Sequence, residues 1–354
     1  MKQHSLLLAL LMLSLLLAAC NDTRASTSTQ EVNLLVVTSG TVRLKRAGWN
    51  AFVPVAAGVR LQPTDLLDVE GSATVLCDGP QVTTMKALGK TPCPTEHGSF
   101  VYDGARFSTG QRGTTQDIPY ISFPRGTIVL DSHPQLRWHA TGTVSYTVTI
   151  MDGAKVVWEQ PDVTGTTIQY PEDAPALLPD TDYLLIVRDT NGKTSEDDAA
   201  KGLGFRVVSA AQRAEVEQRR NAILALTALE PSAQQLALAV YYATWRGEGE
   251  RGLWGEALQL LDQVAQAQDT PAVRLWMGDV ARAMSLPDEA EAAYSQAHQQ
   301  AAATGDRASQ ADAAAGLWRV TGEQDWLDAA LKIYNELGDQ REATALQAEA
   351  APKQ

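Results

Sequence analysis

The chain has 354 residues, of which 44% are hydrophobic, so at about 150 residues per domain it is long enough for two or three globular domains. Lysine and arginine total 29 against 42 aspartate and glutamate residues, a formal net charge of -13. Since nucleic-acid binding needs clustered cations at the phosphates, this balance argues against a nucleic-acid partner. The three cysteines are too few for a disulfide-built miniprotein, and their odd number leaves one that is free, intermolecular or modified.

The first twenty residues have the features of an export signal. Lys2 and His4 precede Leu6–Leu17, a mostly apolar run that rises only about 18 Å as a helix, too short for a bilayer core of about 30 Å. The run therefore predicts a signal peptide over residues 1–19. The sequence Leu-Ala-Ala-Cys that ends at Cys20 resembles the bacterial lipobox, which implies cleavage before Cys20 and its acylation. The alternative is an ordinary secretory signal with a chance cysteine.

Residues 20–30 are rich in Ser, Thr, Asn and Asp, and this composition predicts a disordered tether. Acyl chains contribute about 0.8 kcal/mol for each buried CH2 group, so the lipid would hold an acidic protein on a membrane without help from its charge. No later segment approaches the run of about 18 uninterrupted apolar residues that a spanning helix needs. We therefore expect an exported protein, lipid-anchored to the outer face of a bacterial membrane in the cell envelope.

Residues 31–93 contain short apolar and alternating runs separated by turn signals, a pattern typical of a small all-β domain. Gly40-Thr41-Val42, Trp49, Asp65-Leu66-Leu67 and Cys77-Asp78-Gly79 follow in the order seen in FecR-like domains of bacterial envelope proteins, which the segment resembles. The resemblance implies that fold and a sensing or binding context. It does not imply sigma-factor control, since the required transmembrane helix and cytoplasmic arm are not found in this sequence. Trp49 is either a core residue or a ligand-stacking aromatic.

Cys77 and Cys93 lie sixteen positions apart in this segment. Export would permit a disulfide, and closing a loop of about 15 residues would contribute about 3 kcal/mol by constraining the unfolded chain. We therefore predict a disulfide between Cys77 and Cys93. A metal site is the alternative, but it would need more ligands at short spacing, and His97 is the only nearby imidazole.

Residues 94–119 are rich in Gly, Ser, Thr and Pro and predict a linker or a long loop. Residues 120–208 show the alternation and turn spacing of an antiparallel sandwich. Within them, Leu178–Tyr183 resembles the tyrosine corner of fibronectin type III and related immunoglobulin-like domains, in which the tyrosine hydroxyl bonds backbone upstream. The resemblance implies a spacer or an adhesion surface. We expect His133 and His139 to be surface residues rather than ligands. We expect Trp138 and Trp158 to be core residues rather than carbohydrate platforms.

Residues 209–350 shift to Ala, Gln, Leu and Glu, with apolar residues at helical spacing. Gly278, Pro287–Ala290, Tyr294 and Ala297 have the spacing of the tetratricopeptide repeat, which this segment resembles. The resemblance implies an α-solenoid whose concave groove binds peptides or helices, with a helix bundle or coiled coil as the alternative. The predicted fold is therefore multidomain, with two all-β modules followed by an all-α solenoid.

The family's groove positions, carried over to the best-matching repeat, are Leu275, Asp279 and Arg282, although these positions are equally consistent with ordinary exposed helix. No motif for nucleophilic, metal or phosphate chemistry is present, so we expect no enzyme activity, no cofactor and no metal site. The expected function is a lipid-anchored, non-catalytic envelope scaffold or adaptor that binds a protein partner through its solenoid. The alternative is a FecR-like sensor or a lipoprotein that binds cell-wall glycan.

Overall fold

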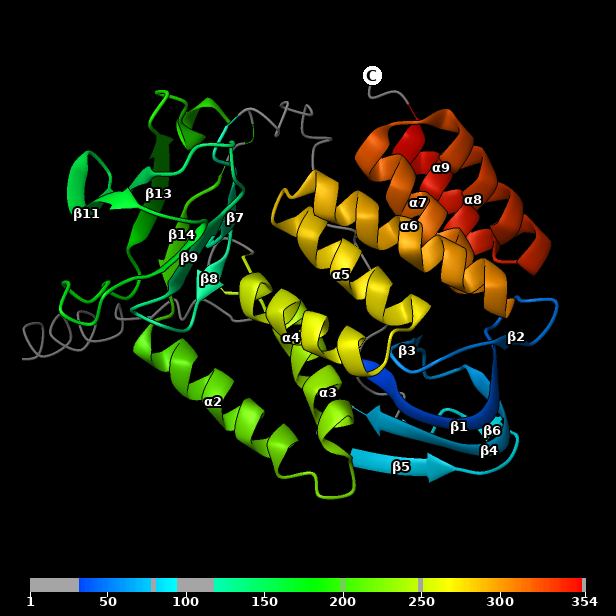
Figure 1. The fold of residues 1–354 in the computed structure, drawn as a ribbon. Helices are drawn as coiled ribbons and strands as arrows, with labels where there is room; N and C mark the ends of the chain where they lie inside the picture. The colour runs from blue at the N-terminus through cyan, green and yellow to red at the C-terminus, as the bar shows by residue number, and fades with distance from the viewer. Residues whose placement is uncertain are drawn as a thin grey trace, which may run out of the picture.

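The order of the two structural classes agrees with the sequence. Among the described residues, the strands lie between Asn33 and Val207, and α-helices follow from Ala210 to Ala350 (Figure 1). The predicted signal peptide, the tether and most of the predicted linker lie outside the described residues. The computed structural model describes residues 32–77, 81–93, 118–198, 200, 202–247 and 251–351.

The first sheet is built around one long antiparallel pair, β1 with β4, in the order β2-β1-β4-β5, while β3 pairs with β1 and β6 with β4. Gly40 and Gly71 face each other in this pair, both with positive φ, and a Cβ on Gly40 would lie only 2.2 Å from the carbonyl oxygen of Glu70. Only glycine permits that approach. The strands are β1 (Asn33–Lys45), β2 (Val53–Pro54), β3 (Arg60–Leu61), β4 (Leu66–Cys77), β5 (Gln81–Met85) and β6 (Gly89–Lys90).

The second β region has two sheets, ordered β11-β10-β13-β14-β8 and β12-β9-β7. Both contribute to one buried cluster, for example Val148 and Leu185 from the first and Leu136 from the second, so the sheets pack face to face. The hydroxyl of Tyr183 accepts a hydrogen bond from Leu178 N at 2.9 Å, the contact predicted for this tyrosine. The strands are β7 (Ile121–Phe123), β8 (Ile128–Val129), β9 (Gln135–Trp138), β10 (Tyr146–Asp152), β11 (Lys155–Val163), β12 (Thr167–Gln169), β13 (Asp182–Asp189) and β14 (Phe205–Val207).

The helices pack in chain order, each from α3 to α8 against the next. Proline opens α3, α5 and α6, where its missing N–H removes a donor that would have no helical partner. Gly278 of α5 and Gly316 of α7 both contact the ring of Tyr294, and a Cβ on either would lie within 2.6 Å of it. The helices are α2 (Ala210–Leu224), α3 (Pro231–Thr244), α4 (Trp254–Ala267), α5 (Pro271–Ala283), α6 (Pro287–Thr304), α7 (Arg307–Thr321), α8 (Gln324–Leu337) and α9 (Gln340–Ala350).

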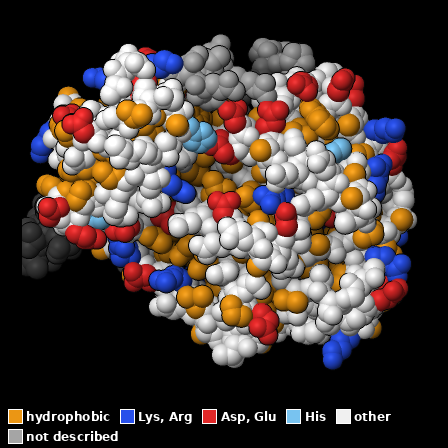
Figure 2. Space-filling model, viewed as in Figure 1, with side chains coloured by type: hydrophobic (Ala, Val, Ile, Leu, Met, Phe, Trp, Pro, Cys, Tyr) orange, Lys and Arg blue, Asp and Glu red, His pale blue; other side chains and the backbone are white. Residues whose placement is uncertain are grey.

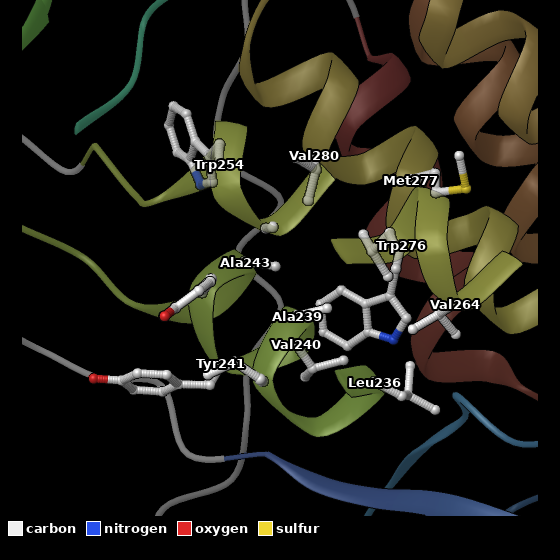
Figure 3. Close-up of a cluster of buried hydrophobic side chains, with 14 of the residues drawn as sticks. Leu236, Ala239, Val240, Tyr241, Ala243, Trp254, Val264, Trp276, Met277 and Val280 are labelled. Carbon is white, nitrogen blue, oxygen red and sulfur yellow. The ribbon is translucent and has the colours of Figure 1, made fainter. Parts of the chain in front are cut away.

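The β regions are packed against the helices and share their core. Leu34 and Val36 on one face of β1 belong to the same buried cluster as the side chains of α3 to α5, while Leu35 on the other face belongs to a cluster that extends to α9. Figure 3 shows part of the first cluster, where the indole of Trp276 lies beside the aliphatic side chains of α3 and Val264. The first part of β1, at Leu34–Val36, is therefore buried on both faces, whereas residues 39–41 in its middle are exposed.

The surface carries both signs of charge. On the face shown in Figure 2, basic and acidic side chains are interspersed, with apolar side chains scattered between them. Across the described ranges, no helix combines the length and the apolar character needed to cross a membrane.

Candidate functional site

The predicted groove residues lie on α5, and the chain itself engages them. The Asp279 carboxylate contacts Arg60 Nη2 of β3 through Oδ2 at 2.9 Å and accepts from the Tyr294 hydroxyl through Oδ1 at 2.8 Å. Arg282 is buried, and its Nε lies 3.3 Å from the same hydroxyl. Leu275 is partly buried against the helical core. The structure thus brings Asp279 and Arg282 together around Tyr294, and the first β region lies against them.

The segment that lies against α5 is the turn and strand start at residues 57–60. Its Arg60 guanidinium lies 3.6 Å from the ring centroid of Trp276, so the cation is both stacked and ion-paired. Trp276 Nε1 donates to Gly58 O at 2.9 Å, and the Thr270 hydroxyl donates to Ala57 O at 2.8 Å. We call residues 57–60 the docking turn. Backbone and side chain both hold it on α5.

Glycine is required at the centre of the docking turn. Gly58 has a φ of +100°, and a Cβ there would lie 3.1 Å from Ala272 Cβ and 3.3 Å from Val273 N at the start of α5. Any side chain would therefore push the turn away from the helix.

A second contact joins the first β region to the end of α8 and the start of α9. Trp49 Nε1 donates to the Asp339 carboxylate at 2.7 Å, and the Trp49 side chain is 4% exposed. Asn50 N donates to Leu337 O at 2.7 Å, next to Gly338, where a Cβ would lie 2.6 Å from a backbone oxygen of the β region. Trp49 is therefore a packing residue, and its ring is closed to a stacking ligand.

Arg46 lies between the two contacts and faces several carboxylates. It donates to Arg60 O at 2.8 Å and lies 3.5 Å from Asp65 Oδ2. Burial alone would lower the pKa of Arg46, but Asp65 and the helical acids Asp312, Asp339 and Glu342 together raise it. Burial also raises the pKa of Asp65, against the opposing effect of Arg46.

Asp312 of α7 has a shifted pKa of its own. Burial raises its pKa to about 6, although its Oδ1 accepts a hydrogen bond from the Tyr334 hydroxyl at 2.7 Å. The positive charge of Arg46 acts in the opposite direction and keeps the anion more stable than burial alone would allow.

The second β region is attached at the turn between α5 and α6. Arg125 is fully buried and donates through Nε to Met284 O at 2.9 Å and through Nη2 to Ser285 O at 3.1 Å, while Nη1 pairs with Asp198 at 2.7 Å. Its guanidinium lies 4.3 Å from the Tyr120 ring centroid, and the Tyr120 hydroxyl donates to the same Ser285 carbonyl. One arginine thus connects both parts of the molecule.

The other residues that the sequence analysis named are cysteines, histidines and tryptophans. Cys77 and Cys93 are joined by a disulfide and are both buried. His133 stacks on Tyr170 with ring centroids 5.5 Å apart, and His139 pairs with Glu289. Trp138 is buried, and Trp158 is partly buried against the same core. Cys20 and His97 lie outside the described residues.

Within the residues that the structure describes, no group of three or more His, Cys, Asp or Glu side chains is arranged to hold a metal ion. No protein-family model matches the chain, and no curated protein matches it. We therefore infer the function from the contacts between the β regions and the helices.

Proposed function

We propose that this protein is an exported, lipid-anchored, non-catalytic scaffold of a bacterial cell envelope. TPR-like repeats hold a FecR-like module and a fibronectin III or Ig-like module in one fixed arrangement, and the assembled unit binds a protein partner. The observation that supports this proposal best is the docking turn, which places Arg60 between Trp276 and Asp279 of α5.

The contacts favour a fixed arrangement over modules that move independently. Relative motion is the default expectation between domains unless their interface is large and apolar. Here the first part of β1 is buried on both faces, and its Leu34 and Val36 share a cluster with α3 to α5. Polar contacts within the interface, such as Trp49 with Asp339 and Arg125 with Met284 O, then specify one orientation.

This arrangement changes the role proposed for the groove. Asp279 and Arg282 are used within the chain, so we propose that the partner binds a surface of the assembled unit and that the groove residues support it indirectly. The unit would reach the membrane through acylated Cys20, without nucleic acid, metal or cofactor. A cell-wall glycan platform at Trp49 is not favoured, because that ring is buried.

Cross-linking in native membranes tests the proposal with full-length, tagged chains. Wild type is compared with Arg60→Ala and Asp279→Ala, which break the same contact from its two sides. Arg188→Ala is the matched control, since Arg188 of β13 forms an exposed ion pair with Glu196. We expect both docking variants to lose the cross-linked partner to a similar extent, and the control to retain it.

Two outcomes would contradict the proposal. If Asp279→Ala loses the partner while Arg60→Ala binds more of it, then the partner competes with the docking turn for the groove. If the wild-type chain cross-links no protein in its own membrane, it is not a scaffold.

A further inference from the structure

The contact between the second β region and helices α4 to α6, which we call the sandwich seam, contains a buried carboxylate. Glu256 in the first turn of α4 accepts a hydrogen bond from Leu130 N through Oε1 at 2.8 Å. Its Oε2 is buried and has no hydrogen-bond partner among the described residues. Burying an ionised carboxylate with one unpaired oxygen costs much free energy, whereas burying the protonated carboxyl costs far less.

The surroundings of Glu256 supply little to offset that cost. Burial raises its pKa to about 7, the backbone N–H groups of Leu130 and of Glu256 itself oppose the rise, and the negative charge of Asp131 adds to it. Tyr242 of α3 faces the same carboxylate, and burial raises the pKa of Tyr242 to about 12, so it stays neutral in ordinary buffers. Glu256 is thus the group here that changes charge near neutral pH.

A second titratable contact crosses the seam beside the α5–α6 turn. His139 Nε2 lies 2.9 Å from Glu289 Oε1 of α6, and the imidazole meets the Tyr120 ring edge-on. The nearby Glu289 carboxylate raises the pKa of His139 and burial opposes this, while Asp288 adds to the rise and Arg125 opposes it. The protonated imidazole is therefore the form that pairs across the seam.

The remaining charged groups of the seam pair with one another. Arg125 is paired with Asp198 inside the seam, and Arg251 pairs with Asp182 at the exposed rim. Arg137 of β9 faces Asp262 of α4, and burial lowers the pKa of Arg137 and raises that of Asp262 while each charge opposes the shift of the other.

We propose that the sandwich seam is a pH-dependent contact, in which closure protonates Glu256 and His139, so that mild acid tightens the seam and alkaline solution loosens it. The two groups lie on opposite elements, one on α4 and one after β9, and they act in the same direction. An exported protein would experience the pH of its surroundings through this contact.

The sign follows from the two states of each group. Opening the seam returns Glu256 toward its usual pKa of 4.5, so its contribution to closure is complete below 4.5 and is lost as the pH rises through about 7. Opening returns His139 toward 6.5, so its contribution is complete below 6.5 and is lost above the raised pKa of the closed seam. Both contributions fall between mild acid and mild alkali.

Hydrogen exchange on the full-length chain measures the effect directly. The reporters are the amides of Leu130 and Ile128, which donate to Glu256 and to Gly252 O across the seam. Val148, in the β10–β13 ladder, is the internal reference. After correction for intrinsic rates, the two pKa values of Glu256 predict that seam protection falls about 30-fold relative to the reference between about pH 5.5 and pH 8.5.

Two variants assign the effect to its groups. Glu256→Gln keeps an acceptor for Leu130 N but cannot ionise, so most of the pH dependence should disappear, and His139→Asn should remove the remainder. Glu323→Gln is the matched control, since Glu323 also stands at a helix start but is exposed. Should Glu256→Gln fail to fold, the wild-type profile and His139→Asn still decide the question. Seam protection in wild type that is unchanged across this pH range would overturn the proposal.

Discussion

Replacement of Arg60 by alanine is expected to loosen the docking turn from α5 without disturbing either element internally. Arg60 and Asp279 are 25% and 23% exposed, so their ion pair lies between a weak surface pair and a fully buried one. The stacking of the guanidinium on Trp276 at 3.6 Å adds about 1 kcal/mol. We expect Arg60→Ala to cost about 2 kcal/mol of unfolding free energy, of which about 1 kcal/mol is coupling to Asp279.

A double-mutant cycle measures that coupling. Arg60→Ala, Asp279→Ala and the double variant are unfolded in urea and followed by far-ultraviolet circular dichroism. Arg60→Lys is the matched control, because it keeps the charge but loses the planar stacking group and should recover only part of the loss. Single-variant costs that simply add would refute the inference that these two side chains hold the docking turn on α5.

The remaining predictions concern other parts of the chain. Cys93→Ser should lower the unfolding free energy by about 3 kcal/mol, and an intact-mass measurement that finds Cys77 and Cys93 as free thiols in non-reduced wild type would contradict the disulfide. Gly278→Ala should cost about 1–3 kcal/mol in a thermal melt because its Cβ would meet the ring of Tyr294, and an unchanged melting temperature would contradict that packing. Cys20→Ala should release the chain from the membrane fraction, and retention there would exclude lipid attachment at this residue. Asp312→Asn should flatten the pH dependence of stability, since the contribution of Asp312 is complete below pH 3.8 and lost as the pH rises through about 6; an unchanged profile would contradict this.

Local features of the fold could be predicted because their causes lie close together in the sequence. The spacing from Gly278 to Tyr294 indicates a tight helix crossing, and the structure places Gly278 against that ring. The Tyr183 hydroxyl accepts a hydrogen bond from the backbone N–H of Leu178, which lies only five residues upstream. The order of a β part before a helical part follows from the change in hydrophobic period near residue 209.

The docking contacts could not be predicted because they join distant segments. Arg60 meets Asp279 across 219 positions, and Trp49 meets Asp339 across 290. Hydrophobic periodicity indicates which face of an element is buried, but not which other element covers it. A groove residue such as Asp279 looks exposed when its own repeat is considered alone. The same holds for Arg125, which is fully buried because it donates to the carbonyls of Met284 and Ser285, 159 and 160 positions away.

If the first β region and the helices form one fixed unit, the distance between spin labels placed on the two parts should also be fixed. Labels are placed on the membrane-bound full-length chain at Glu70→Cys on β4 and Gln347→Cys on α9, both exposed positions. We expect a single narrow distance distribution in the otherwise wild-type chain, and a broader one when Arg60→Ala is added. A broad distribution already present in the wild-type background would contradict it.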